Sequence, residues 1–198
     1  MKKTIGLRKR WLRNTVGVIA VLGLVFVLLA TGVYAYYRYS QTEKDLRQRA
    51  EATAEYFAAH SNQNYEEFYG ECVAYVRTFT DRDSVELQLL DANGKVEASS
   101  QITWVGSAPD TSEIADAREA AATYVGFDTM VGQRVMALSS PVIYNGQSIG
   151  IFRYVIATEQ MDLRILWFGT CVLACLAAML WVIIMVNGLY IQSVINPI

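Results

Sequence analysis

Two long runs without a charged residue, residues 14–37 and 165–191, constrain this chain more than any other feature. They are about 24 and 27 residues long, and a helix that spans a bilayer needs about 20 mostly apolar residues. Each run therefore predicts a transmembrane helix. About 127 residues lie between the runs, which is the size of one small domain.

Charge is distributed unevenly along the chain. Six basic residues and no acidic residue precede the first run, whereas all 19 acidic residues and the other 11 basic residues lie between the runs. Basic residues beside a first span stay in the cytoplasm. The pattern predicts a cytoplasmic N-terminus at residues 1–13 and an extracytoplasmic domain at residues 38–164. That domain carries a formal excess of about eight negative charges.

A cleaved signal peptide is the alternative explanation of the first run. Val33-Tyr34-Ala35 has the small residues of a cleavage site, and the start of the chain is basic. The apolar core of a signal peptide is usually about 7–15 residues long, which is shorter than this run. We therefore expect an uncleaved anchor, and the domain between the runs lies outside in either case.

The segment after the first run keeps a helical period. Leu46, Ala50, Ala54 and Phe57 fall on one helix face, and charged residues occupy the other. This predicts that the first helix continues into the outer domain. A second apolar stripe predicts a helix over residues 65–79.

The rest of the outer domain is predicted to form strands and one further helix. Asn-Gly pairs mark two tight hairpin turns, because Asn and Gly adopt positive φ at low cost. The last strand is apolar on both faces, which predicts a central strand or one covered by the long helix. The fold class is therefore α+β, with helices packed on a five-stranded antiparallel sheet. The predicted strands are residues 85–89, 95–100, 124–130, 134–144 and 148–158, and the further helix is residues 110–122.

Two hairpin sequences resemble a known family. Residues 87–96, LQLLDANGKV, resemble the first hairpin of extracytoplasmic PAS-like, or single Cache, domains. Residues 139–155, SSPVIYNGQSIGIFRYV, resemble the last hairpin of these domains in sensor histidine kinases, particularly those of Gram-positive bacteria. Residues 192–198 end in INPI, which resembles the opening of a HAMP linker with its proline at Pro197.

The resemblance implies a transmembrane signal-sensing module of a two-component sensor histidine kinase in the plasma membrane of a bacterial cell. It implies a homodimer in membrane lipid, an extracytoplasmic ligand, no nucleic acid, and a response regulator that the missing C-terminal part phosphorylates. Within this chain we expect no catalytic residue and no cofactor: the one histidine, His60, lies in the outer domain, and no glycine-rich loop follows a strand. ATP and Mg²⁺ are expected only for the missing kinase domain.

Other receptors remain open as alternatives. A chemoreceptor or a nucleotide cyclase could use the same outer domain and spans. A membrane-anchored domain that binds a partner without signalling, or a secreted domain tethered by its second span, is also compatible with the pattern.

Candidate ligand-binding residues are polar side chains on the last three predicted strands. Arginine pairs with carboxylates, and tyrosine or aspartate adds hydrogen bonds or charge. The alternative is that these are ordinary strand residues with solvated tips. The candidates are Tyr124, Asp128, Arg134, Arg153 and Tyr154.

An acidic surface from Glu66 to Glu86 is a second candidate, for divalent cations or cationic peptides, although no spacing matches a calcium loop. We predict no metal site. Cys171 and Cys175 lie four residues apart without further ligands nearby, and Cys72 is the one cysteine of the outer domain.

Signal coupling is expected at four positions. Thr170, Ala174 and Ala178 are small residues at four-residue spacing in the second run, and such residues allow close contact between helices. We expect them to face the first span or a second copy of the chain. Pro197 marks the point where motion would enter the HAMP linker.

Overall fold

The structure is a computed structural model, which describes residues 3–60, 63–101 and 104–195. Contacts divide the chain into a folded unit, Arg38–Met161, and a terminal unit made from Met1–Tyr37 and Asp162–Ile198. The elements in chain order are α1 (Lys3–Ala59), α2 (Tyr65–Arg77), β1 (Glu86–Leu90), β2 (Val96–Ser99), α3 (Glu113–Asp116), β3 (Ala122–Asp128), β4 (Gln133–Tyr144), β5 (Gln147–Ala157) and α4 (Glu159–Ile195).

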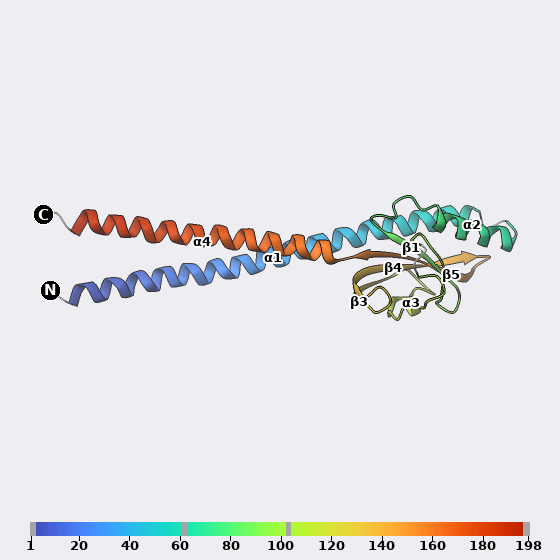
Figure 1. Cartoon of the computed structure of the whole chain (residues 1–198), viewed down its shortest axis with the longest axis horizontal. Helices are drawn as coiled ribbons and strands as arrows, with labels where there is room; N and C mark the ends of the chain where they lie inside the picture. Colours follow the sequence, from blue (N-terminus) through green and yellow to red (C-terminus); the bar gives the residue numbers. More distant parts are fainter. Residues whose placement is uncertain (1–2, 61–62, 102–103, 196–198) are drawn as a thin grey trace. The chain divides into compact units, whose positions relative to one another are not determined.

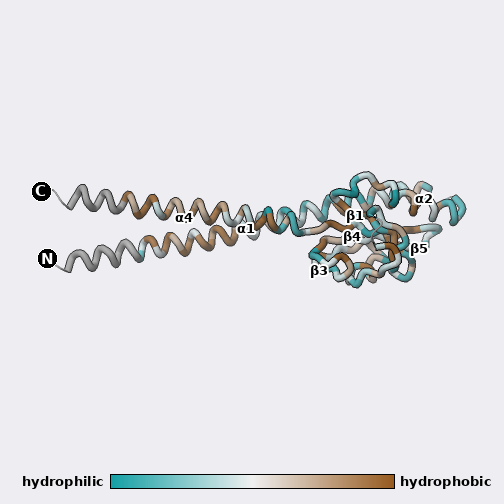
Figure 2. Tube along the Cα trace, in the orientation of Figure 1, coloured by the Kyte–Doolittle hydropathy of each residue, from teal (hydrophilic) through white to brown (hydrophobic). Residues whose placement is uncertain are grey.

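The terminal unit consists of apolar helix. Asn14–Ala59 of α1 and Glu159–Val186 of α4 each contain a stretch that is long and apolar enough to cross a membrane. Figure 2 shows a hydrophobic band on each helix. Most large apolar side chains in these bands are exposed, for example Phe26 and Trp167 at 65% and 67%. Exposed apolar surface of this extent is compatible with a helix that crosses a membrane.

The folded unit is built on one five-stranded antiparallel sheet with the strand order β2-β1-β5-β4-β3 (Figure 1). β5 lies at the centre and pairs with β1 on one side and β4 on the other. This confirms the predicted α+β class, and it explains why β5 is apolar on both faces: helices cover one face of the sheet, and α3 with its loops covers the other.

α1 and α2 cover the first face of the sheet. The apolar stripe of α1 buries Leu46 and Phe57, and α2 buries Phe68 and Val76, each at 3% exposure or less. They pack in one cluster with strand residues such as Tyr154. Burial of each large apolar side chain contributes roughly 1.5–3 kcal/mol, so this face is the main core of the domain.

α3 covers part of the opposite face and is shorter than predicted. Its single turn ends at Asp116, whereas the sequence predicted a helix to Ala122. Ala122 instead pairs with Ser139 at the start of β3. The alanine-rich segment has high helix propensity, but the strand pairing and the burial of Ala117 override it.

Candidate functional site

A row of buried polar residues crosses the sheet on the α3 side. Gln88 of β1 and Ser139 of β4 are the direct cross-strand partners of Arg153 on β5. Direct partners point to the same face of an antiparallel sheet. All three side chains are 0% exposed, so the sheet carries a polar strip inside an otherwise apolar layer.

Arg153 lies at the centre of this strip and donates hydrogen bonds to four other residues. Its Nε donates to Glu113 Oε1 at 3.0 Å, and its Nη2 donates to Asp128 Oδ2 at 2.8 Å and to Thr111 Oγ1 at 3.1 Å. Its Nη1 donates to Gln88 Oε1 at 3.2 Å. One guanidinium therefore ties β5 to β1, to the end of β3 and to the segment that leads into α3.

The turn after β3 is held by the same group. Oδ1 of Asp128 accepts hydrogen bonds from the backbone N–H groups of Met130 at 2.8 Å and Val131 at 3.2 Å, while Oδ2 accepts from Arg153. A carboxylate with this many donors is well compensated for its burial. Asp128 therefore fixes the β3–β4 turn relative to the central strand.

Negative charge exceeds positive charge in this buried group. Glu113 and Asp128 are both 0% exposed and share one arginine. Oε2 of Glu113 has no hydrogen-bond partner among the described residues. A buried carboxylate oxygen without a donor is costly, so the group favours any additional positive charge nearby.

A polar pocket adjoins this strip at Glu86, which we call the Glu86 pocket. It has a volume of about 270 Å³. Oε1 of Glu86 accepts hydrogen bonds from Gln88 Nε2 at 2.9 Å and from Ser99 Oγ at 2.8 Å, so Gln88 links the pocket wall to Arg153. Residues that line the Glu86 pocket include Asp83, Glu86, Trp104, Val131, Val155 and Ala157.

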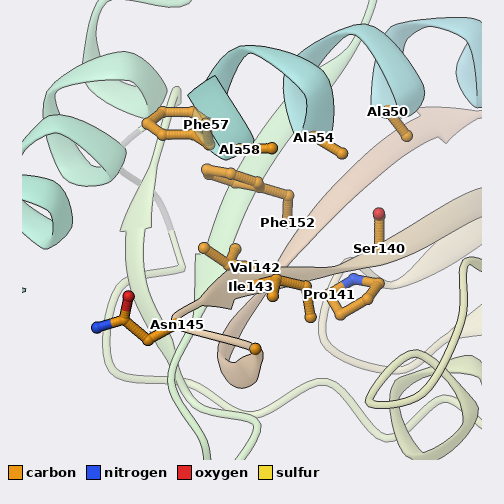
Figure 3. Close-up of a pocket in the computed structure, with 11 residues that line it drawn as sticks. Ala50, Ala54, Phe57, Ala58, Ser140, Pro141, Val142, Ile143, Asn145 and Phe152 are labelled. Carbon is orange, nitrogen blue, oxygen red and sulfur yellow. The ribbon is translucent and has the colours of Figure 1, made fainter. Parts of the chain in front are cut away.

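A larger pocket of about 390 Å³ lies on the helix-covered face, between α1 and the β4–β5 hairpin. Figure 3 shows Ala54 and Phe57 of α1 across the pocket from Val142 and Ile143 of β4. The described residues that line it are mostly apolar and include no charged side chain. This pocket could bury an apolar group of a ligand, but its described lining provides no charge that would orient the ligand.

Two of the five candidate ligand residues come together. Asp128 and Arg153 form the 2.8 Å ion pair described above. Tyr124 lies on the same face of the sheet, but its hydroxyl donates to the backbone oxygen of Phe127 at 3.1 Å. In this structure the guanidinium of Arg153 pairs with two carboxylates of the chain itself, those of Glu113 and Asp128. Ligand binding by Tyr124, Asp128 and Arg153 stays a prediction.

The other two candidates lie elsewhere. Tyr154 faces α1, where its hydroxyl donates to Thr53 Oγ1 at 2.7 Å, and burial raises the pKa of its phenol above the ordinary value. Arg134 shares the face of Met136 and has an exposed side chain. Neighbouring residues of a strand point to opposite faces, so Arg153 and Tyr154 cannot share one pocket.

Several members of the site were not among the five ligand candidates of the last three strands: Glu86, Gln88, Thr111 and Glu113. Glu86 belongs to the predicted acidic surface. Glu86 and Gln88 occupy alternate positions of a strand, a pattern that places both on one face. Alternation with leucine predicts a solvated face, whereas the structure buries both residues. No strand pattern surrounds Thr111 or Glu113 in the sequence. Glu113 was interpreted as the start of a helix.

The expected coupling residues of α4 lie in the terminal unit, where Thr170, Ala174 and Ala178 are exposed. In the same unit the rings of Tyr34 and Phe168 stack with their centroids 4.4 Å apart. Contact of the three small residues with the first span or with a second copy of the chain stays a prediction.

β5 and α4 are separated by one residue, Thr158. It is 0% exposed, its N–H donates to the backbone oxygen of Arg134 at 3.0 Å, and its hydroxyl donates to the same oxygen at 3.2 Å. The start of α4 at Glu159 is therefore anchored to the sheet through β4. Pro197 lies outside the described residues.

No family model matches the chain, and no curated protein matches its sequence. Among solved structures it is similar to the ligand-binding domain of the Campylobacter jejuni chemoreceptor Tlp3 with L-norvaline, at 16% identity over 82% of this chain and a TM-score of 0.44. It is also similar to the ligand-binding domain of the Pseudomonas aeruginosa amino acid chemoreceptor PctC with GABA, at 16% identity over 65% of this chain and a TM-score of 0.43. A third similar structure is the sensor domain of the Vibrio cholerae histidine kinase DctB, at 17% identity over 48% of this chain and a TM-score of 0.41. The chain spans 64%, 60% and 39% of the lengths of these three proteins.

Proposed function

We propose that this chain is the sensing and membrane-spanning part of a receptor, in which a stimulus at the α3 side of the sheet is relayed through β5 to α4. The observation that carries the proposal is the connection between these two elements. β5 holds Arg153 at the centre of the sheet, and Thr158 alone separates it from a helix apolar enough to cross a membrane. A shift of the central strand therefore reaches the membrane segment without an intervening flexible linker.

The output that this proposal favours is a protein-histidine kinase. The hairpin sequences that resemble those of sensor kinases and the HAMP-like end of the chain support this choice. The kinase domain would bind ATP and Mg²⁺, phosphorylate a response regulator and act as a homodimer. A chemoreceptor or a nucleotide cyclase would use the same sensing part with a different output.

The proposed orientation is testable by cysteine labelling in cells. Cys72, Cys171 and Cys175 are first replaced by alanine, and single cysteines are then introduced at Ala92, an exposed turn position, or at Thr4 before the first span. We expect a membrane-impermeant maleimide to label Ala92→Cys in intact cells and Thr4→Cys only after permeabilisation, because the basic N-terminus stays inside.

Labelling after denaturation is the control for expression of both variants. Labelling of Thr4→Cys but not Ala92→Cys in intact cells would reverse the orientation and remove the external sensor. Loss of the Thr4→Cys label even after denaturation would indicate a cleaved signal peptide.

A further inference from the structure

The Glu86 pocket has the charge of a cation site. Asp83 and Glu86 are the charged residues of its described lining, which includes neither lysine nor arginine. Glu86 is only 7% exposed. Both of its hydrogen bonds go to Oε1, which leaves Oε2 without a donor among the described residues. A nearly buried carboxylate with one free oxygen favours a positively charged ligand.

The structure behind the pocket does not neutralise Glu86. The nearest buried cation in the connected group is Arg153, which Glu86 reaches only through Gln88. Arg153 already pairs with Glu113 at 3.0 Å and with Asp128 at 2.8 Å. Among the described residues of the pocket and the strip, four carboxylates therefore stand against one basic side chain, that of Arg153.

The remaining lining selects the kind of cation. Trp104 is half-buried at the pocket wall, Val131 and Val155 add aliphatic surface, and the neutral polar residues of the lining are Ser84, Gln101 and Gln133. An indole face is the best aromatic partner for an ammonium group, and aliphatic surface suits its methyl substituents. Ca²⁺ instead takes six to eight oxygen ligands. Two carboxylates beside an indole and aliphatic side chains match an alkylammonium ion better than a bare metal ion.

We propose that the Glu86 pocket binds a small organic cation of the alkylammonium class. Glu86 supplies the opposite charge, Trp104 the aromatic face, and Asp83 a weaker, exposed attraction. Ala157 lines the pocket one residue before Thr158, so an occupant would contact the end of β5 where it joins α4. The consequence for signalling rests on the proposed sensor function, whereas the binding itself does not.

Binding is testable by calorimetry on the full chain in detergent micelles, with choline as the probe and its neutral isostere 3,3-dimethylbutan-1-ol as the matched compound. We expect saturable binding of choline and at least about tenfold weaker binding of the alcohol, which corresponds to 1.4 kcal/mol. Glu86→Gln and Trp104→Leu should each weaken choline binding about tenfold. Asp83→Asn should weaken it less, because Asp83 is exposed and solvent screens its charge.

Glu119→Gln is the control, because it removes an exposed acid outside the pocket and should leave choline affinity unchanged. Circular dichroism checks that each variant is folded, and Trp104→Leu carries the test if Glu86→Gln unfolds. Equal affinity for choline and the alcohol, absence of saturable choline binding, or tighter binding of Ca²⁺ with displacement of choline would each overturn the proposal. None of these results bears on the membrane orientation, which the labelling experiment tests separately.

Discussion

Arg153→Met is expected to lower the free energy of unfolding by about 3–5 kcal/mol, the cost of breaking a buried ion pair from one side. The substitution keeps the volume of the side chain but leaves Glu113 and Asp128 buried without their shared cation. It also removes the hydrogen bonds to Gln88 and Thr111. Denaturant unfolding of the full chain in micelles, followed by far-ultraviolet circular dichroism, measures the change.

Two further variants separate the charge effect from lost packing. The triple variant Arg153→Met, Glu113→Gln, Asp128→Asn should regain part of the loss, because it no longer buries unpaired carboxylates. Arg47→Met is the surface control: Arg47 pairs with Glu43 at 3.6 Å and is 44% exposed, so the change should be about 0–1 kcal/mol. An equal effect of Arg153→Met and Arg47→Met would mean that the buried group does not hold the sheet together.

Phe57→Ala should cost about 3–5 kcal/mol, which is typical for truncation of a buried aromatic residue. Phe57 is 3% exposed, and its ring centroid lies 5.3 Å from that of Phe152, 5.7 Å from Phe68 and 5.5 Å from Tyr75. It therefore joins α1, α2 and β5 in one aromatic cluster, and Figure 3 shows it next to Phe152. The denaturant midpoint of the full chain measures the loss.

Two control variants accompany this prediction: Phe57→Leu, a conservative change at the same position, and Tyr56→Ala, a truncation of the exposed neighbour. The leucine variant keeps most of the apolar volume and should cost less than about 1.5 kcal/mol. Tyr56 precedes Phe57 on α1 but is 50% exposed, so its truncation should cost much less than that of Phe57. Similar losses for Phe57→Ala and Tyr56→Ala would contradict the assignment of the core to the face of α1 that carries Phe57.

Local sequence patterns predicted most of the fold. The Asn-Gly turn at Asn145, which has a φ of 50°, placed the β4–β5 hairpin, and the apolar faces of β5 predicted its central place. The stripe that includes Leu46 and Phe57 predicted the buried face of α1. These features depend on neighbouring residues. The predicted length of α3 was wrong. The end of this helix depends on the pairing of Ala122 with Ser139, which no local sequence pattern encodes.

The candidate site was harder to predict because its contacts join distant segments. Glu113 and Arg153 are 40 residues apart in the sequence, and Gln88 and Arg153 are 65 apart. Residue chemistry selected Arg153 and Asp128 as candidates. It gave no information on which carboxylates pair with the guanidinium of Arg153. Strand alternation places Arg153 and Tyr154 on opposite faces from the sequence alone, and the structure shows them on opposite faces.

Autophosphorylation of a fusion protein tests the relay from β5 to α4 most directly. Residues 1–198 are joined in frame to the HAMP, dimerisation and ATP-binding domains of a sensor histidine kinase, and one to four alanines are inserted between Glu159 and Gln160. Because a helix has about 3.6 residues per turn, two alanines turn α4 by roughly half a turn relative to the sheet and four restore its phase. Two alanines between Glu119 and Ala120, in the segment between α3 and β3, are the matched control.

We predict that the rate of autophosphorylation in membrane vesicles changes by about fivefold or more with two alanines and returns towards the native rate with four, while the control insertion leaves it unchanged. The same rate for every insertion would contradict the relay, and the folded unit would then be a membrane-anchored domain that does not signal through α4.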